Sequence, residues 1–478
     1  MDRCAIMNET LDSRFLKARR NYIASQFSQL NDMQREAVLT TEGPLLLLAG
    51  AGSGKTTVLI NRIANIMRFG RGSDSNEIPE AVSEEDVAFL ESVGEEINEY
   101  DRWRADNLCS VEPAVPWSII AITFTNKAAK EFKERLFNSL GEQAQDIWAG
   151  TFHSICVRIL RRYIDRLGYK NDFAIYDADD SKKLVNEILK EENIPESLLP
   201  ASAALSFISK AKENGRTPAD EALDAGTDLR LVKSAKVYDR YQKRLKSANA
   251  LDFDDIIALT NDLLETNKDV LEKYREQFRY ILVDEYQDTN PSQSRLVSFL
   301  SGKHKNVCVV GDDDQSIYSF RGATVDNILG FDREYKNTKV IRLEQNYRST
   351  GNILKAANGI IENNRDRKGK ELWTDSGDGE KVHIHRLYTQ AEEADFICQT
   401  IEKKVGLGAR YSDFAILYRV NALSNSLETM LVKKKIPYKI YGGIRFFERK
   451  EIKDILAYLA VIANPADTVR LRRIINLP

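Results

Sequence analysis

The stretch Leu45–Thr56, which reads LLLLAGAGSGKT, decides the fold of this chain. Its first five residues are all apolar, as in a strand that is buried on both faces, and a glycine-rich turn follows them. Apolar residues then recur at helical spacing from Leu59 to Met67. Strand, glycine-rich loop and helix in this order are typical of a phosphate-binding loop, in which backbone N–H groups and a helix N-terminus face phosphate oxygens.

Two residues of this loop have the side chains that a bound nucleoside triphosphate needs. In the pattern G-x-x-x-x-G-K-[ST] the lysine reaches the β and γ phosphates, and the hydroxyl binds Mg²⁺. Lys55 and Thr56 hold these positions, whereas Ala49 stands where the first glycine of the pattern usually is. The loop therefore predicts a site for ATP and Mg²⁺.

A second apolar run, Tyr280–Val283, ends in the acidic pair Asp284-Glu285. Ligands of open α/β sheets bind at the carboxyl ends of the strands, so this pair belongs to the same edge as the phosphate loop. We expect Asp284 to hold Mg²⁺, usually through water, and Glu285 to orient and deprotonate the attacking water. Alone, an apolar run before Asp-Glu also fits a capped helix start, but the phosphate loop strengthens the first interpretation.

Composition sets limits on the class of protein. The chain has 478 residues, with 42% hydrophobic and 29% charged residues, which suggests a globular protein of about three domains. We find no run of apolar residues long enough to span a membrane. The five cysteines are scattered without a CxxC pair, which favours a reducing, cytoplasmic compartment. The formal net charge is −3, but residues 71–112 hold thirteen acids against three arginines, so the rest of the chain is positive.

The order of apolar runs predicts an α/β fold with parallel sheets. Further strands are expected at 118–123, 307–310, 340–343, 381–387 and 413–418. Residues 177–275 show helical periodicity and no convincing strand, which indicates an all-helical subdomain inserted into the first sheet. Residues 1–21 are expected to form a short helix or a frayed arm. The acidic segment 68–116, with one helical stretch near 87–100, is expected to be a surface insertion.

Four motifs resemble the UvrD/Rep/PcrA family of superfamily 1 DNA helicases, and the resemblance covers about residues 22–478 apart from the acidic segment. They are TFTNKAA at 123–129, DEYQDTN at 284–290, GDDDQSIY at 311–318 and LEQNYRS at 343–349. The resemblance implies two RecA-like P-loop motor domains, the second incomplete, with an inserted helical subdomain and the start of a second helical insertion. It also implies a cytoplasmic, nucleoid-associated protein.

The resemblance sets the expected domain boundaries. They are 1–21 for the N-terminal arm, 22–172 for the first part of the first motor domain with the acidic insertion 68–116, 173–247 for the inserted helical subdomain, 248–345 for the second part of the first motor domain, 346–445 for the first part of the second motor domain, and 446–478 for the start of the second helical insertion.

The same resemblance implies roles for the nucleotide site. Gln34 matches the glutamine that reads adenine, and Tyr347 matches the aromatic residue that stacks on it. Arg348 matches an arginine that contacts the γ phosphate, and Gln315 matches the residue that senses it. The expected catalytic residues are Glu285, Lys55, Gln315 and Arg348. The expected nucleotide-binding residues are Gln34, Ala51, Gly52, Ser53, Gly54, Lys55, Thr56, Thr57, Tyr347 and Arg348, with Thr57 where relatives often have arginine, and the expected metal ligands are Thr56 and Asp284.

A translocating motor must hold single-stranded DNA without reading its sequence, which aromatic faces and phosphate-binding groups achieve. The expected track has stacking aromatics and groups that contact phosphate. These residues are Phe124, Thr125, Asn126, Lys127, Thr151, His153, Phe253, Tyr318, Phe320 and Arg321. Phe320 stands where many relatives have tryptophan, so we expect a weaker stacking contact there.

The leading hypothesis is an ATP-dependent 3′-to-5′ DNA helicase or translocase of DNA repair or replication. Its expected partners are single-stranded DNA, DNA junctions and repair or replication proteins. Two family motifs are expected beyond Pro478, so we interpret the chain as a fragment that unwinds little by itself. The alternatives are the motor subunit of a recombination helicase-nuclease and a regulatory module that binds single strands without translocating. The acidic segment 68–116 is expected to be a solvated appendage or a partner-binding site.

Overall fold

The computed structural model describes residues 10–94, 97–365, 367–441 and 450–475. The chain divides into two compact units. The larger comprises Met1–Glu380 and Ala466–Val469, and the smaller comprises Lys381–Pro465 and Arg470–Pro478. The division at 380 falls inside the range 346–445 that the sequence assigns to one domain, and the domain boundaries stay a prediction. No helix among the described residues is both long and apolar enough to cross a membrane.

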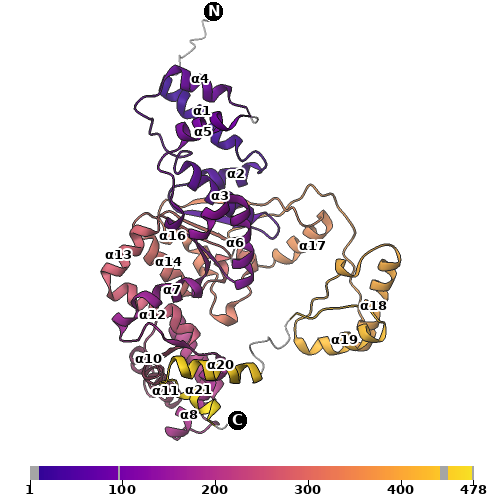
Figure 1. The fold of residues 1–478 in the computed structure, drawn as a ribbon. Helices are drawn as coiled ribbons and strands as arrows, with labels where there is room; N and C mark the ends of the chain where they lie inside the picture. The colour runs from indigo at the N-terminus through magenta and orange to yellow at the C-terminus, as the bar shows by residue number, and fades with distance from the viewer. Residues whose placement is uncertain (1–9, 95–96, 366, 442–449, 476–478) are drawn as a thin grey trace, which may run out of the picture. The chain divides into compact units, whose positions relative to one another are not determined.

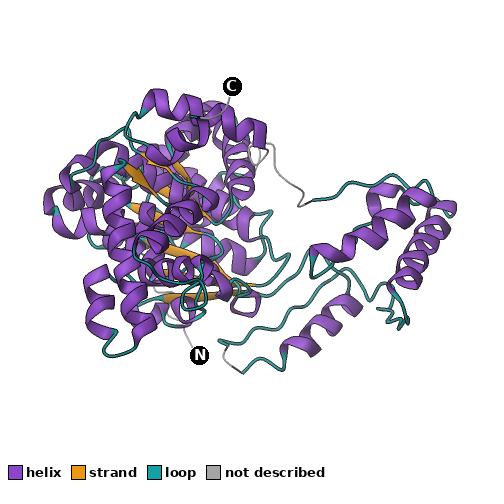
Figure 2. Cartoon of the chain, turned by 90° about the horizontal axis from the view of Figure 1, so that it is seen from below, coloured by secondary structure: helices purple, strands orange, loops and turns teal. Residues whose placement is uncertain are grey.

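A six-stranded parallel sheet forms the centre of the larger unit (Figure 2). Its order is β3-β2-β6-β7-β1-β8. The strands are β1 Leu45–Ala49, β2 Ile119–Thr123, β3 Trp148–Thr151, β6 Tyr280–Val283, β7 Val307–Gly311 and β8 Lys339–Leu343. Because all neighbouring strands are parallel, their carboxyl ends lie at one edge of the sheet. The expected α/β class with a parallel sheet is confirmed.

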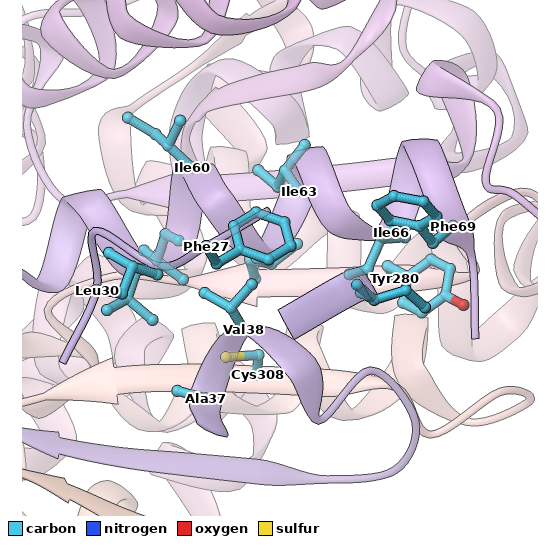
Figure 3. Close-up of a cluster of buried hydrophobic side chains, with 14 of the residues drawn as sticks. Phe27, Leu30, Ala37, Val38, Ile60, Ile63, Ile66, Phe69, Tyr280 and Cys308 are labelled. Carbon is cyan, nitrogen blue, oxygen red and sulfur yellow. The ribbon is translucent and has the colours of Figure 1, made fainter. Parts of the chain in front are cut away.

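Helices cover both faces of this sheet. Alternate residues of β1 face opposite cores: Leu45 and Leu47 belong to one cluster, and Leu46 and Leu48 to the other. The first core packs against α2 Asp32–Leu39, α3 Lys55–Phe69 and α6 Asn126–Leu140 (Figure 3). The second packs against α7 Phe152–Tyr163, α12 Phe253–Thr266, α13 Lys268–Gln277, α14 Pro291–Ser301, α15 Asp326–Leu329 and α16 Phe331–Glu334. Burial on both faces explains why the strands read as continuous apolar runs.

The N-terminal segment and the acidic segment pack together (Figure 1). The structure has a full helix, α1 Leu11–Ser25, and two helices, α4 Glu84–Ser92 and α5 Glu99–Cys109, where the sequence predicted one. Phe15, Val87 and Cys109 are fully buried in one core, and Arg14 pairs with acids of α4. The expectation of a solvated appendage was therefore wrong, because the apolar residues among the acids have α1 to pack against.

The helical subdomain has its own core, formed by α8 Ala178–Glu191, α9 Ala201–Glu213 and α11 Leu229–Ser247, and α10 Pro218–Asp224 packs on α11. The structure adds a short parallel pair that the sequence did not indicate. It joins β4 Ala174–Ile175 to β5 Ala250–Leu251 at the two ends of the subdomain. Two-residue strands are too short for a periodic pattern, so only the pairing identifies them.

The predicted strands at 381–387 and 413–418 were wrong, since no strand is formed between residues 381 and 441, all of which the structure describes. Ile384 and Leu417 are each 94% exposed. Apolar residues in such segments indicate a strand only when a neighbouring strand pairs with them. After β8 come α17 Gly351–Ile361, α18 Gln390–Gly406, α19 Ser424–Lys433, α20 Lys450–Ala463 and α21 Thr468–Ile474.

Candidate functional site

The phosphate loop lies between the carboxyl end of β1 and the start of α3. Gly52 and Gly54 have φ angles of 69° and 83°, a left-handed conformation that glycine adopts without strain. A Cβ atom on Gly54 would lie 2.7 Å from the side-chain amide nitrogen of Gln34. Helix α3 begins at Lys55 without a side-chain cap on Gly54, so its first N–H groups are free to bind phosphate oxygens.

Lys55 and Glu285 form an ion pair across the edge of the sheet. The Lys55 ammonium lies 2.9 Å from Glu285 Oε2. Glu285 follows β6 with a φ angle of 51°, an uncommon conformation for a residue with a side chain. The amide of Gln287 donates to the same carboxylate at 3.0 Å. The structure thus brings together the expected phosphate-binding lysine and the expected catalytic acid.

The pKa values of the two acids at the end of β6 are shifted in opposite directions. Burial, followed by the charge of Glu285, raises the pKa of Asp284 to about 6. Burial also opposes ionisation of Glu285, but the charge of Lys55 and hydrogen bonds from Gln287 and Lys55 hold its pKa below the ordinary value. Glu285 is therefore ionised at neutral pH, as an acceptor of a proton from water must be.

Gln287 joins the acidic strand end to the next strand. Its side-chain oxygen accepts a hydrogen bond from the backbone N–H of Asp312 at 2.9 Å. Asp312 in turn accepts from the amide of Gln315, the expected γ-phosphate sensor. The sequence did not single out Gln287, because its role requires β7 to lie beside β6, which only the sheet order establishes.

Asn31 connects the two residues that we expect to contact adenine. It caps α2 by accepting from the N–H of Gln34, and its side-chain amide donates to the Tyr347 hydroxyl at 2.8 Å. Gln34 is 5% exposed and its amide donates to the Ser53 carbonyl at 2.9 Å, while Tyr347 is 53% exposed. The signal for Asn31 was its position three residues before Gln34, as in a capping box.

The chain after β8 packs directly on the phosphate loop. The side-chain amide of Asn346 donates to the Ala51 carbonyl at 2.5 Å, and the backbone N–H of Tyr347 donates to the Gly52 carbonyl at 2.9 Å. A Cβ atom on Gly52 would lie 2.7 Å from Cβ of Arg348. The Cβ atom of Arg348 thus lies beside the phosphate loop, while its expected role stays a prediction, and Asn346 is a contact that the sequence did not indicate.

Three hydroxyl side chains lie in the phosphate loop and the first turn of α3, namely Ser53, Thr56 and Thr57. The Ser53 hydroxyl donates to the Gly50 carbonyl at 2.8 Å, so it braces the loop. Thr56 and Thr57 lie in the first turn of α3. A hydroxyl from Thr56 and a carboxylate from Asp284 are the oxygen ligands that Mg²⁺ prefers, so the residues present fit this ion.

One group of aromatic side chains follows β2 and β7. The ring centroids of Phe124 and Tyr318 are 5.1 Å apart, and those of Tyr318 and Phe320 are 5.9 Å apart. Arg321 lies 5.7 Å from the centroids of both Tyr318 and Phe320. Phe320 is 72% exposed, so its ring is accessible to a base that would stack on it.

A second group lies at the starts of α7 and α12. The ring centroids of His153 and Phe253 are 4.4 Å apart, and Phe253 is 58% exposed. Burial lowers the pKa of His153 to about 4 despite a hydrogen bond with the backbone of Phe253. His153 is therefore neutral near pH 7 and can contact phosphate only as a hydrogen-bond donor.

Two threonines of the expected track cap helices at the same edge. Thr125 accepts from the N–H of Ala128 to cap α6, and Thr151 accepts from the N–H of Ser154 to cap α7. Asn126 and Lys127 begin α6 and are exposed. These helix N-termini carry partial positive charge, which suits a phosphate backbone.

The helical subdomain contacts this region through the end of α9. Lys212 is fully buried and lies 2.7 Å from Asp252 and 2.8 Å from Asp255 at the start of α12. The next residue, Glu213, fills the space beside Gly322, where any Cβ atom would clash with its carboxylate. The sequence did not indicate this contact, because α9 and residue 322 are far apart along the chain.

Comparison with known proteins gives two family matches. Residues 30–78 and 104–336 match the UvrD/REP helicase N-terminal domain, and residues 341–478 match the UvrD-like helicase C-terminal domain. The ATP-dependent DNA helicase PcrA of Staphylococcus aureus (strain Mu50) is 46% identical over 451 residues, which are 94% of this chain and 56% of that protein. PcrA of Staphylococcus epidermidis (strain RP62A) is 46% identical over 449 residues, with the same two shares.

The chain thus spans a little over half the length of these curated relatives. The two family matches cover most of its residues, including the phosphate loop, the acidic strand end and the residues after β8. The motifs that suggested the resemblance lie within the same ranges. The chain therefore belongs to the UvrD/REP helicase family.

Proposed function

We propose that this chain is the motor region of an ATP-dependent DNA helicase that moves along single-stranded DNA in the 3′-to-5′ direction. The observation that supports it best is the shared edge of the sheet. Strands β1, β6 and β7 lead into Lys55, Glu285 and Gln315. Phe124 follows β2, which neighbours β6, and Tyr318 follows β7 itself. Nucleotide chemistry and contact with a strand are therefore built on one rigid scaffold.

The proposed hydrolysis uses the ion pair at the loop. Bound ATP places its phosphates at the N-terminus of α3, where the Lys55 ammonium leaves Glu285 for the β and γ phosphates. Glu285 then accepts a proton from water as the water oxygen bonds to the γ phosphorus and the bond to the bridging oxygen of ADP breaks. When bound, Mg²⁺ supplies positive charge to the phosphates. Arg348 stabilises the charge on the transferred phosphoryl group.

The proposed coupling to DNA runs along residues 311–321. Gln315 contacts the γ phosphate in one nucleotide state, and the same short segment continues into Tyr318 and Phe320, which we propose to stack on bases. A shift of Gln315 on hydrolysis therefore changes the position of these rings. We also propose that DNA junctions and proteins of DNA repair or replication are partners, and that the protein works at the nucleoid in the cytoplasm.

Replacement of Phe320 by alanine tests the DNA track. Stacking on one base is worth ~1–3 kcal/mol, so the Kd for oligo-dT is expected to rise about 5- to 150-fold. Fluorescence anisotropy with a labelled oligonucleotide measures the Kd, and the same oligonucleotide is expected to stimulate ATP hydrolysis by the wild-type protein. Phe137→Ala is the matched control, because Phe137 is also exposed but lies at the C-terminal part of α6. If single-stranded DNA did not raise the ATPase rate of the wild-type protein, the proposed function would be refuted.

Glu213 is expected to make DNA binding depend on pH. Burial, followed by the charge of Asp254, raises the pKa of Glu213 to about 7. The side chain is therefore neutral below that pH and negative above it, so binding of DNA beside Gly322 weakens as pH rises through 7. The folded state also binds this proton more tightly than the unfolded state does, so the contribution of Glu213 to stability falls as pH rises from about 4.5 to about 7.

The measurement is the Kd for oligo-dT between pH 6 and pH 8 at constant ionic strength. Glu213→Gln is expected to flatten the rise in Kd that the wild-type protein shows. Glu196→Gln, at an exposed glutamate of the same subdomain, is expected to leave the rise unchanged. Equal slopes for the wild-type protein and Glu213→Gln would contradict the prediction.

A further inference from the structure

We propose that Lys370 is a positioning residue that couples the nucleotide sensor Gln315 to the DNA track. Its ammonium contacts three aspartates at the end of β7, namely Asp312, Asp313 and Asp314, and it acts on Gln315 through Asp312. The inference rests on the proposed function, because it assumes that Gln315 responds to nucleotide and that the segment after it contacts DNA.

The Lys370 ammonium bridges all three aspartates. It lies 2.6 Å from Asp312 Oδ1, 2.5 Å from Asp313 Oδ1 and 2.7 Å from Asp314 Oδ2. The exposed fraction of the lysine side chain is 3%, and those of the three aspartates are 3%, 1% and 7%. A lysine is rarely so buried unless it is paired, and here one ammonium uses its three donors on three consecutive acids.

The electrostatics make this lysine necessary for the local arrangement. One oxygen from each aspartate lies within 4.8 Å of the other two, so the carboxylates repel one another without a cation between them. Burial opposes the charge of Lys370, but the three aspartates outweigh that effect and raise its pKa. Because the ammonium already contacts all three acids, the cluster is a lysine site and we do not propose that it binds a metal.

Asp312 connects this cluster to the sensor. Its carboxylate contacts Lys370 through one oxygen and accepts from the amide of Gln315 through the other. Its backbone N–H donates to Gln287, whose amide contacts Glu285. A continuous set of contacts therefore runs from the catalytic acid to Lys370, and the orientation of Gln315 depends on how firmly Asp312 is held.

The segment that carries Lys370 is tied to the phosphate loop as well. The Arg367 guanidinium lies 2.9 Å from Asp314, and the backbone N–H of Lys368 donates to Asp313 at 2.7 Å. Leu372 packs where a Cβ on Gly50 would lie. Residues 367–373 thus join the end of β7 to the phosphate loop, and Lys370 is the contact that reaches the sensor.

The test compares Lys370→Gln with the double variant Lys370→Gln/Asp313→Asn. The single variant removes the cation, and the double variant also removes one buried carboxylate, so it restores the net charge of the cluster and safeguards folding. Asp313→Asn alone keeps both Lys370 and Asp312. Lys368→Met is the matched control, because the Lys368 ammonium pairs with Asp332 at 2.7 Å and not with the cluster.

Two quantities measure the coupling between the nucleotide site and the DNA track. One is the factor by which oligo-dT raises the kcat of ATP hydrolysis. The other is the ratio of the Kd values for oligo-dT with and without ATPγS. Lys370→Gln and the double variant are expected to lose about 5- to 150-fold of this coupling, the usual range for linked sites. The affinities of these two variants for ADP, and for oligo-dT without nucleotide, are expected to stay unchanged. Asp313→Asn and Lys368→Met are expected to keep wild-type coupling and wild-type affinities.

Two results overturn the inference. If Lys370→Gln/Asp313→Asn recovered wild-type coupling, Lys370 would only neutralise the charge of the aspartates. Loss of coupling in Lys368→Met to the same degree would mean that any damage to residues 367–373 has this effect. A wild-type protein without stimulation by oligo-dT contradicts the proposed function instead, so the two failures are distinguishable.

Discussion

Replacement of Lys55 by alanine is expected to lower ATP turnover roughly 10²- to 10³-fold, the loss that follows removal of one preorganised electrostatic donor. The Lys55 ammonium contacts Glu285 at 2.9 Å, and in the proposed mechanism it moves to the phosphates. Its removal takes this charge away from the phosphates and leaves the half-buried Glu285 without its cation, so nucleotide affinity is expected to fall as well. Steady-state ATPase assays and ADP titration measure the two effects.

Lys303→Ala provides the matched control for this change. Lys303 pairs with Glu276 at 2.9 Å on the surface, so loss of its charge is expected to leave turnover unchanged. Thermal melting of both variants separates a catalytic effect from unfolding. Turnover in Lys55→Ala within the error of the wild-type value would exclude the proposed role of the loop.

Replacement of Glu285 by glutamine is expected to lower kcat roughly 10²- to 10⁴-fold, which is the contribution of a positioned general base. Glutamine has nearly the same shape, and its oxygen can still accept from Lys55, but it cannot take a proton from water. ATP binding is therefore expected to survive while hydrolysis stops. A burst experiment that counts ADP formed on the enzyme distinguishes slow chemistry from slow product release.

Glu272→Gln is the control for the loss of a carboxylate, since Glu272 pairs with Arg275 on the surface of α13. The two variants together separate nucleotide binding from hydrolysis, because Lys55→Ala is expected to weaken nucleotide binding and Glu285→Gln is expected to preserve it. If Glu285→Gln hydrolysed ATP at the wild-type rate, another group would have to accept the proton.

The phosphate loop could be predicted from sequence because its parts are contiguous. One strand, one turn and one helix N-terminus hold Lys55 and Thr56 in place, and the φ angles of Gly52 and Gly54 agree with that local interpretation. The acidic pair after Tyr280–Val283 was also predictable, since a buried strand that ends in carboxylates has one natural place in a parallel sheet. The order of the helicase motifs along the chain then indicated the family, and the comparisons with known proteins show the same family.

Other expectations failed because they depended on partners. Residues 381–387 and 413–418 resemble strands, but a strand forms only where another strand pairs with it. The acidic segment seemed a solvated appendage because acids dominate its composition, yet Val87 and Cys109 are buried against α1. Composition counts charges without showing which face of a helix carries them.

By itself, the sequence determined the strand, loop and helix of the phosphate loop, the parallel α/β class and the family, because each depends on residues that are neighbours along the chain. Only the tertiary structure decided that β7 lies between β1 and β6, that Asn31 joins Gln34 to Tyr347, and that Lys370 holds the aspartates beside Gln315. These contacts join residues up to hundreds of positions apart, and packing alone brings them together.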